Sequence, residues 1–409
     1  MDLIQAAASF GFLPLRLRIV PQQELRLPAI SKSNTLRGAF GMAFRRLVCI
    51  PQCREARQCP LGQTCPYRII FEPSPPPGAD RLSKNQDIPR PFIFRPPLST
   101  ATTYAPGNAF EFTLILLGKA VDFLPYFILA FREVASEGIG LNRAQCTLER
   151  VEQIDLSEFG VRGSGLGDAI RNPESNIPSP EPRVPSPAPA LIYTAADQLF
   201  RTPKASTLSD YVRTRMEHLL PVPGNLSPVT FSISTAFLTP TYLKSEGHAV
   251  RQPEFHHLFK RVRDRLNALS TFYGPGPIDA DFKGLGQAAE KVRTTNCDVH
   301  WQERNRHSSK TGQRHELSGF TGKCVYEFPS LDSGISNPES RVSIDESGVS
   351  NPECRVSNPK CGISNPESGI SNPECGISNL ELLQWLICGE LIHAGRHTPW
   401  GNGWFQVGE

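Results

Sequence analysis

The stretch Phe12-Leu-Pro-Leu-Arg-Leu-Arg-Ile-Val20 alternates between apolar and basic side chains. In an extended chain the aliphatic residues fall on one side and the two arginines on the other, which predicts a strand with one buried face. Ser33-Asn-Thr then precedes apolar residues spaced by four, four and three positions, namely Leu36, Phe40, Phe44 and Leu47. This pattern predicts an amphipathic helix that begins near Ser33 as its cap.

Similar patterns continue on both sides of a Pro-, Gly- and Ser-rich segment at residues 163–190. Before it we expect an extended Pro-rich segment at 89–97, strands at 109–117 and 145–153, and a helix at 125–137 between those strands. After it we expect strands at 229–237, 299–306, 322–328 and 404–407, and helices at 253–272, 285–292 and 380–393.

This order predicts an α+β fold of two tandem ferredoxin-like (RRM-like) domains. We expect the N-terminal domain at residues 1–162, a linker at 163–190 and the C-terminal domain at 191–409. A chain of 409 residues is long enough for two separate cores.

The net charge is only +3, but the basic residues are concentrated in two runs. Residues 26–68 carry eight Lys or Arg residues against the single acid Glu55. Residues 304–323 carry five against Glu316, together with His307 and His315. Either run can contact phosphate groups of a nucleic acid, or it can form an ordinary solvated face.

Residues 333–381 form seven tandem heptads of the pattern Ser/Cys-Gly/Arg-Ile/Val-Ser-Asn-Pro-Glu. Each unit has a single aliphatic residue and most contain Gly or Pro, so the repeat lacks the apolar seam of a coiled coil. A short-period β-solenoid is the structured alternative. We expect a disordered, low-complexity insertion in the second domain, between a strand and a helix.

Four of the eleven cysteines lie within seventeen residues, at Cys49, Cys53, Cys59 and Cys65. We find no secretory signal, and charged residues and a proline interrupt the most apolar window at 112–131, so we expect a cytoplasmic chain without a membrane partner. In that compartment we expect thiols or metal ligands and not a disulfide framework. Four thiolates suit a structural zinc ion, and an iron–sulfur cluster or unligated thiols are the alternatives. A zinc ion with four protein ligands has no open position for catalysis.

The segment Gly395-Arg-His-Thr-Pro-Trp-Gly-Asn-Gly403-Trp-Phe is a glycine-rich connection between the last helix and the last strand. Glycines let backbone N–H groups approach a phosphate, and Arg396 and His397 add charge and hydrogen bonds beside it. A plain tight turn is the alternative explanation of these glycines.

The order of several segments resembles the RAMP superfamily of CRISPR-associated proteins, in particular its precursor-RNA endoribonucleases, the Cas6 family. The glycine-rich connection is similar to the closing motif of that family, and the helix ahead of it is similar to the helix that enters the motif. Further similar segments are Phe237-Leu-Thr-Pro-Thr-Tyr-Leu, the helix with Arg261 and Arg265, Trp301 with Arg306, and Gly319-x-x-Gly322. In the first half, Leu36-Arg-Gly-Ala-Phe-Gly41, Pro89-Arg-Pro-Phe and Gly138-Ile-Gly140-x-x-Arg143 resemble members that carry a cysteine cluster.

The resemblance implies two ferredoxin-like domains and a nuclease of antiviral defence that cleaves CRISPR repeat RNA without a catalytic cofactor. In that reaction the ribose 2′-OH attacks the adjacent phosphate and leaves a 2′,3′-cyclic phosphate and a 5′-OH. The implied partners are repeat RNA and subunits of a CRISPR effector complex. The implied RNA-binding residues are Arg45, Arg46, Arg143, Arg306, Gly395, Arg396, Gly401 and Gly403.

The first helix lacks the histidine that many similar proteins place there. All nine histidines lie at or beyond His218, and Met42 stands where related sequences often have histidine. We therefore expect His397 to transfer the proton, with Lys32 and Arg37 as catalytic cations. The alternatives are proton transfer by His307 or by a first-helix cation, a catalytically silent RAMP subunit that holds guide RNA, and a zinc-stabilised nucleic-acid-binding module.

Overall fold

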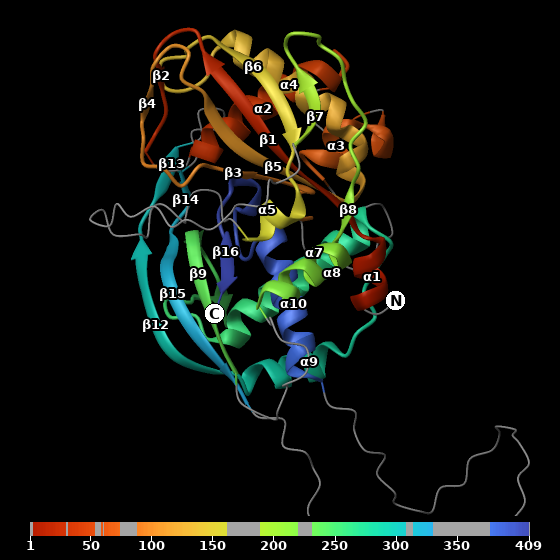
Figure 1. Cartoon of the computed structure of the whole chain (residues 1–409), viewed down its shortest axis with the longest axis vertical. Coiled ribbons are helices and arrows are strands. Elements are labelled where there is room, and N and C mark those ends of the chain that lie inside the picture. The colour runs from red at the N-terminus through yellow and green to blue at the C-terminus, as the bar shows by residue number, and fades with distance from the viewer. Residues whose placement is uncertain are drawn as a thin grey trace, which may run out of the picture.

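Two antiparallel sheets, one in each half of the chain, organise the fold (Figure 1). The computed structural model describes residues 3–29, 32–53, 59, 61–73, 88–161, 189–219, 231–307, 314–329 and 377–408. We call the parts built on the two sheets the first and the second unit, and the first lies above the second in Figure 1. The mixture of helices and antiparallel strands confirms the predicted α+β class.

The first unit has a sheet of the order β3-β5-β1-β6-β7, and β8 pairs with the start of β1. Its strands are β1 (Gly11–Pro21), β3 (Phe92–Arg95), β5 (Phe110–Leu117), β6 (Cys146–Gln153), β7 (Ala190–Thr194) and β8 (Ser206–Thr207), with a small ladder of β2 (Leu25–Arg26) and β4 (Thr103–Tyr104). Its helices are α1 (Leu3–Ser9), α2 (Lys32–Val48), α3 (Pro66–Ile70), α4 (Leu124–Glu137) and α5 (Leu156–Val161), with 3-10 turns η2 (Gly62–Thr64) and η3 (Gly118–Phe123).

The alternation predicted for β1 is confirmed. Leu15, Leu17 and Ile19 are buried on the face that α2 and α4 cover. The intervening arginines form ion pairs instead, Arg16 with Glu158 and Arg18 with Glu111 and Glu149. The sheet therefore buries its aliphatic side chains and pairs its charged ones, as an alternating strand should.

Phe40 of α2 lies at the centre of an aromatic cluster between α2, α4 and β3. Its ring stacks on Phe127 of α4 at 4.7 Å and meets Phe92 and Phe94 of β3 at 5.7 and 5.5 Å. Aromatic contacts of this kind bury a large apolar area and prefer specific ring geometries. The cluster thereby fixes where the N-terminal turn of α2 lies relative to β3.

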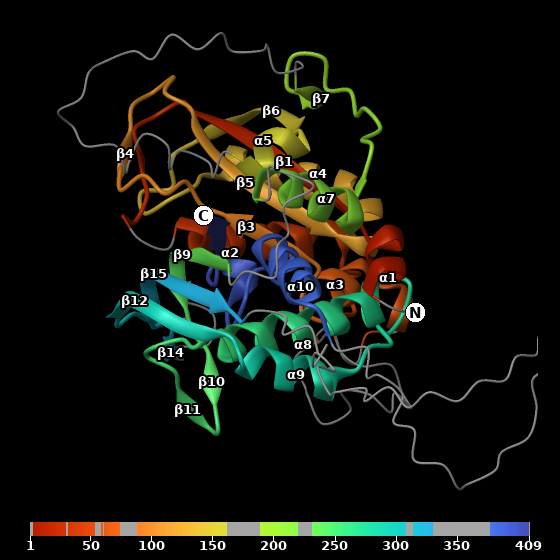
Figure 2. The ribbon, with the colours of Figure 1, turned by 60° about the horizontal axis from the view of Figure 1, so that its bottom comes forward.

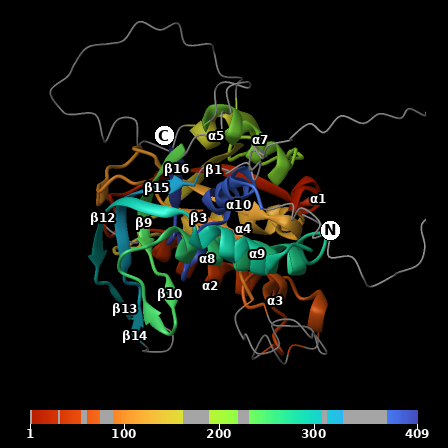
Figure 3. The same cartoon turned by 90° about the horizontal axis from the view of Figure 1, so that it is seen from below.

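The second unit has a sheet of the order β12-β15-β9-β16. Its strands are β9 (Phe231–Thr241), β12 (Arg293–Gln302), β15 (Gly319–Phe328) and β16 (Phe405–Gly408), with two small hairpins, β10 (Lys244–Ser245) with β11 (His248–Ala249) and β13 (Asn305–His307) with β14 (Arg314–Glu316). Its helices are α8 (Phe255–Tyr273), α9 (Phe282–Glu290) and α10 (Asn379–Ile392), and the turn η4 (Thr398–Trp400) precedes β16. Figures 2 and 3 show α8 and α9 side by side, next to α10.

One hydrophobic core joins the two units. Phe12, Ile93 and Ile115 of the first sheet belong to the same buried cluster as Phe237 of β9 and Leu386 of α10. Helix α7 (Leu208–Leu219) follows β8 and contacts α1, α5 and α10. The two sheets therefore share buried apolar area, which holds the units in a defined relative position.

A buried polar network lies at the same junction. Arg215 of α7 donates two hydrogen bonds of 2.9 Å to the carboxylate of Glu390 on α10. The Tyr211 hydroxyl and the Val407 N–H also donate to that carboxylate, at 3.0 and 2.6 Å. A buried carboxylate is tolerated only when its charge and lone pairs are satisfied in this way.

Three features of the structure differ from the sequence-based expectation. Strands β7 and β8 lie beyond the expected linker and pair with the first sheet, so residues 190–207 pack with the first unit although we expected the second domain from residue 191. Helix α7 was not expected. The Ser33 side chain is not a helix cap: α2 already begins at Lys32, and the Ser33 hydroxyl donates to the carbonyl oxygen of Trp400.

Most of the predicted linker and of the heptad insertion lies outside the described residues, so the linker itself and the expected disorder of the insertion stay predictions. The last residues assigned to the insertion, Asn379 to Glu381, form the first turn of α10, and Ser378 caps that helix by accepting from the Glu381 N–H at 3.1 Å. The Asn379 side chain donates to the Pro329 carbonyl oxygen at 2.7 Å. The chain therefore leaves and re-enters the second unit at one point. Within the described residues, no helix is long and apolar enough to cross a membrane.

Because its two ends meet, the insertion should be replaceable. We predict that a short Gly-Ser linker in place of residues 333–376 raises the free energy of unfolding by about 1–2 kcal/mol, since a shorter loop costs less closure entropy. Denaturant unfolding monitored by circular dichroism measures this change. A scrambled insertion of equal length is the control and should match the wild type. A loss of several kcal/mol on replacement would show that the repeats pack as structure.

Candidate active site

The glycine-rich connection predicted to bind phosphate links α10 to β16. Three of its glycines, Gly395, Gly401 and Gly403, have positive φ, and so do His393 and His397. A Cβ atom at Gly403 would lie 1.8 Å from the Ala394 carbonyl oxygen, and one at Gly401 would lie 2.5 Å from the Phe94 carbonyl oxygen. These glycines are required because the backbone is left-handed and closely packed at both positions.

The backbone N–H groups of this loop are used within the protein. The N–H of Gly403 donates to Pro240 at 3.0 Å, that of Gly401 to Thr398 at 2.9 Å and that of Arg396 to Tyr242 at 3.2 Å. These three donors are bonded to carbonyl oxygens and are not available to a phosphate. Charge for a phosphate must therefore come from side chains.

The loop packs against the N-terminal turn of α2. The Ser33 hydroxyl donates to the Trp400 carbonyl oxygen, and Gly401 lies against β3 at Phe94. Arg95 of β3 is buried, and it donates to the Glu390 carbonyl oxygen at 2.5 Å and to Nε2 of His393 at 2.9 Å. These contacts bring the first helix and the glycine-rich loop together, although about 360 residues separate them in the chain.

Trp400 joins two of the predicted catalytic residues. The His397 ring stacks on the Trp400 ring at 4.5 Å with an interplanar angle of 3°. The Arg37 guanidinium lies over the Trp400 ring at 5.0 Å and over the Phe71 ring at 4.5 Å. Cation–π contacts hold a guanidinium in place without neutralising it. His397 and Arg37 therefore belong to one site, and Trp400 sets their spacing.

Lys32, the third predicted catalytic residue, is buried at 1% exposure. Its Nζ donates to the carbonyl oxygens of Ser99 at 2.5 Å and Ala29 at 3.4 Å. Burial lowers the pKa of this amine. The structure thus places Lys32 inside the protein, beside the start of α2, where it ties the helix to the segment after β3.

A cavity of about 800 Å³ opens beside His397, between the two units. Its wall includes Ile88 to Arg90 of the first unit, the outer face of α8 and the glycine-rich loop. Five of the lining residues carry a fixed positive charge: Arg90, Lys244, Arg261, Arg265 and Arg396. Among the described residues of the wall, Asp264 is the one carboxylate, and it forms an ion pair with Arg263 at 2.9 Å. A concave surface of one charge attracts anions.

Main-chain carbonyl groups anchor several of these cations. Arg90 Nε donates to Phe71 at 2.9 Å, Arg265 Nε donates to Ile392 at 2.8 Å, and Arg261 donates to Lys244. Nη2 of Arg265 is buried and has no hydrogen-bond partner among the described residues. Burial lowers the pKa of Arg265 to about 9, so it stays charged at neutral pH. An unused buried donor favours an incoming anion.

Arg45, Arg46 and Arg143 do not line this cavity. Arg46 pairs with Glu133 at 2.6 Å and Glu137 at 2.5 Å on α4, so its charge is used within the first unit. Arg45 lies beside Cys49 and Tyr67, and Arg143 lies in an exposed turn with φ 51°. Arg306 lies on β13. Among the predicted RNA-binding residues whose side chains are described, Gly395 and Arg396 line the cavity.

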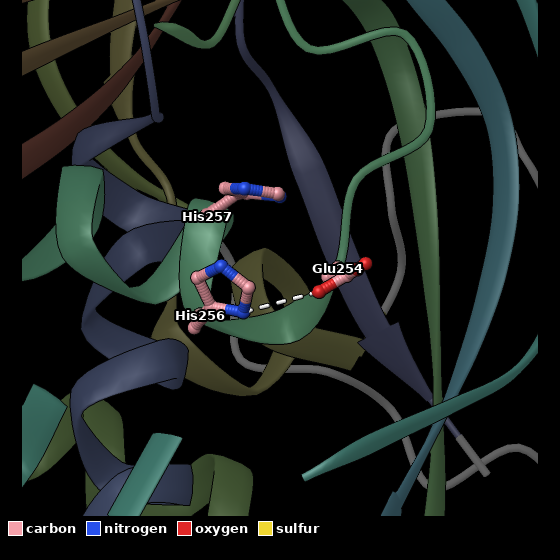
Figure 4. A group of neighbouring side chains, drawn as sticks. All are labelled: Glu254, His256 and His257. Carbon is pink, nitrogen blue, oxygen red and sulfur yellow. Dashed lines mark ion pairs between the residues drawn. The ribbon is translucent and has the colours of Figure 1, made fainter. Parts of the chain in front are cut away.

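His393 and the two histidines at the start of α8 lie in different surroundings. His393 is buried between Arg95 and the carbonyl oxygen of Asn402, and burial followed by the Arg95 charge holds its pKa well below the usual range. It is a neutral structural residue. Glu254, His256 and His257 at the start of α8 form a second group, whose potential ligand atoms lie within 4.8 Å of one another (Figure 4). His256 Nδ1 lies 3.4 Å from Glu254 Oε2, an ordinary surface ion pair.

The four predicted metal ligands are neighbours, with thiol contacts linking Cys49 to Cys53, Cys53 to Cys59 and Cys59 to Cys65. Burial raises the pKa of the Cys49 thiol to about 11, and the adjacent Cys53 and Cys65 contribute. By contrast, the Leu61 N–H lowers the pKa of Cys59, because it donates to the sulfur. Thiols crowded in this way, with a backbone donor for one sulfur, fit a thiolate-bound metal ion.

Sequence reasoning missed the residues that complete the site. Trp400 was quoted only as part of the loop, Tyr242 and Arg90 only as parts of longer motifs, and Lys244 was not singled out. The four-residue spacing of Arg261 and Arg265 places both on one face of a helix, which was a usable indication. Nothing in the sequence indicates that this face meets the loop.

Residues 236–405 match the family model described as CRISPR-associated endoribonuclease Cas6, and residues 10–175 match a model described as an N-terminal domain. The chain is similar to a solved Cas6 product complex (13% identity, TM-score 0.44, covering 98% of this chain and 99% of that chain). It is also similar to Thermus thermophilus Cas6 (13% identity, TM-score 0.41, covering 98% of this chain and 99% of that chain). A further similar structure is a partial Cas6-RT-Cas1-Cas2 complex (11% identity, TM-score 0.48, covering 98% of this chain and 46% of that chain). A search among curated proteins found no match.

The packing of the loop generates a direct test. We predict that Gly403→Ala lowers the free energy of unfolding by about 3 kcal/mol, because its Cβ adds a clash to the left-handed strain. Gly107→Ala is the matched control, since Gly107 has φ 82° and no atom within 4 Å of the added Cβ. It should cost only about 1 kcal/mol, the strain alone. Equal losses in urea unfolding would show that crowding does not constrain the loop.

Proposed function

The chain belongs to the Cas6 family of CRISPR-associated endoribonucleases, and from this premise we propose that it cleaves CRISPR precursor RNA within the repeats, at the cavity between the two units. The observation that carries the proposal is the cavity itself. Five cationic side chains and His397 face one space, and the carboxylate found among the described lining residues, Asp264, is paired. RNA carries one phosphate charge per nucleotide, and neutralising phosphates releases counterions.

The chemistry we propose is metal-independent transesterification. The ribose 2′-OH attacks the adjacent phosphorus and the 5′-oxygen leaves, which gives a 2′,3′-cyclic phosphate and a 5′-OH. His397 moves a proton to or from one of these oxygens, since histidine can accept and donate near neutral pH. Cations beside it stabilise the extra charge of the phosphorane.

Arg37 and Arg396 are suited to that electrostatic role. Arg37 reaches the site through its contact with Trp400, and Arg396 follows Gly395 on the exposed side of the loop. Lys32 acts instead as a positioning residue, because its amine already binds two carbonyl oxygens. In this proposal His397 of the second unit transfers the proton, and Arg37 of the first unit supplies part of the positive charge.

The arrangement of strands supports a finer statement of the fold. In the first unit β1, α2, β3, β5, α4 and β6 follow in chain order, and the sheet order is β3-β5-β1-β6. In the second unit β9, α8, β12, β15, α10 and β16 repeat that pattern, with the order β12-β15-β9-β16. Each unit is then a ferredoxin-like domain. The partners in this proposal are repeat RNA and other CRISPR proteins, and the site of action is the cytoplasm.

We also propose a structural zinc ion at the cysteine cluster. Cys49, Cys53, Cys59 and Cys65 would hold it, and the ion would supply no catalytic chemistry because all four positions are filled. Cys49 directly follows α2, and Cys65 directly precedes α3. The ion would therefore tie the C-terminal end of α2 to α3 and steady the helix whose other end carries Arg37.

The role of His397 is tested by substitution. We predict that His397→Asn lowers the single-turnover rate of repeat-RNA cleavage about 10²-fold, while the affinity for RNA changes little. Asn is preferred to Ala because residue 397 has φ 63°, a conformation that Asn tolerates. Arg37→Ala should weaken both affinity and rate. His248→Ala, at an exposed position of β11, is the control and should leave both unchanged.

The outcomes separate the candidate functions. Unchanged cleavage in His397→Asn together with abolished cleavage in Arg37→Ala or Lys32→Ala would move the chemistry to α2. Tight binding without cleavage by the wild-type protein would favour a silent guide-RNA-binding subunit, a role that the missing first-helix histidine also favours.

The zinc proposal predicts about one zinc atom per chain in elemental analysis of the purified protein. Changing Cys53 and Cys59 together to Ser should remove it. The expected result also includes a lower thermal midpoint, because metal binding contributes to folding free energy. Cys146→Ser is the control, since Cys146 is a buried free thiol on β6, outside the cluster. Zinc retained by the double variant would refute the assignment.

A further inference from the structure

A second set of stacked side chains begins next to His397. The Arg396 guanidinium lies 5.1 Å from the Tyr242 ring. The Tyr242 ring lies 5.8 Å from the Trp301 ring, tilted by 56°. The Arg251 guanidinium lies 4.7 Å from the Trp301 ring. These four residues form a continuous array, which we call the Trp301 array, of two rings flanked by two cations.

The Trp301 array starts in the cavity and ends outside it. Arg396 and Tyr242 line the cavity, whereas Trp301 lies near the end of β12, the edge strand of the second sheet. Both rings are half-buried, and the two arginines are exposed. Trp301 also packs against the hydrophobic core. The rings are therefore held by the fold while part of their surface faces solvent.

The composition of the array selects its ligand. Aromatic rings and guanidinium groups both offer flat faces on which nucleobases stack, and the arginines also attract phosphate groups. In a duplex the base faces are already covered by their neighbours, so only an unpaired segment can use such a surface. Because the array is continuous with the cationic cavity, an RNA strand bound in the cavity can run on along the array.

We propose that the Trp301 array binds an unpaired segment of the RNA that flanks the phosphate held in the cavity. This inference rests on the proposed function and adds a subsite to it. Tyr242 and Trp301 each stack on a base, and Arg396 and Arg251 contact the phosphates of the same nucleotides. Arg251, which is exposed, leaves the Trp301 ring when a base takes its place. Tyr242, Trp301 and Arg251 contribute to binding and not to the chemical step, whereas Arg396 also serves the chemistry in the cavity.

The test compares three repeat RNAs: one with unpaired segments on both sides of the cleavage position, and two that each lack one of the segments. Trp301→Ala should weaken binding of the complete RNA about 10-fold or more, since stacking is worth about 1–3 kcal/mol per base. One truncated RNA should already bind the wild type more weakly and should be insensitive to Trp301→Ala. The cleavage rate at saturating protein should stay unchanged.

Matched variants isolate the role of stacking. Trp301→Phe keeps a flat ring and should restore most of the affinity. Tyr126→Ala removes an exposed aromatic side chain on α4, outside the array, and should have no effect. If Trp301→Ala fails to fold, Arg251→Ala at an exposed position carries the same test, with a smaller expected loss.

Wild-type affinity for the complete RNA in Trp301→Ala, alongside normal cleavage, would overturn the array while leaving the proposed function intact. An equal loss of affinity with all three RNAs would also overturn it, because the effect would then not depend on an unpaired segment. Failure of the wild-type protein to bind any of the three RNAs would instead refute the proposed function, and the array with it.

Discussion

The buried guanidinium of Arg95 constrains the rest of the structure. It lies on β3 of the first sheet, is 5% exposed, and donates to the Glu390 carbonyl oxygen and to His393, both at the end of α10. A buried cation is costly unless acceptors surround it. Burial lowers its pKa to about 10, which leaves it charged near neutral pH. The end of α10 must therefore meet β3, and the glycine-rich loop that follows must pass α2.

Other features follow from that placement. Glu390, whose carbonyl oxygen binds Arg95, uses its carboxylate for Arg215 and so draws α7 into the junction. The loop folds back with positive φ at its glycines, which presses Trp400 toward Ser33 and Arg37. His397 stacks on the same tryptophan and faces the cationic cavity. His397 of one unit and Arg37 of the other are thus brought together by packing that is structural in origin.

The sequence predicted the elements better than their connections. The alternation of β1, the apolar spacing of α2 and the strand–helix order of both units are local patterns, and the structure confirms them except at Leu47, which is exposed at the end of α2. Strands β7 and β8 and helix α7 were missed because their pairing with the first unit depends on contacts distant in sequence. Lys32 could not be recognised as buried, since its acceptors include Ser99, far along the chain. The glycines were expected to serve a ligand, whereas their left-handed backbone serves the packing of the loop.

We propose that side chains of the cavity between the units cleave repeat RNA without a catalytic metal ion. The most direct measurement is incubation of the full-length protein with its own repeat RNA in the presence of a chelator that removes free divalent cations, followed by analysis of the product ends. The account predicts cleavage at one position in the repeat, with a 2′,3′-cyclic phosphate on the upstream fragment and a 5′-OH on the downstream fragment. Cleavage only when divalent cations are added back, with 5′-phosphate ends, would contradict it.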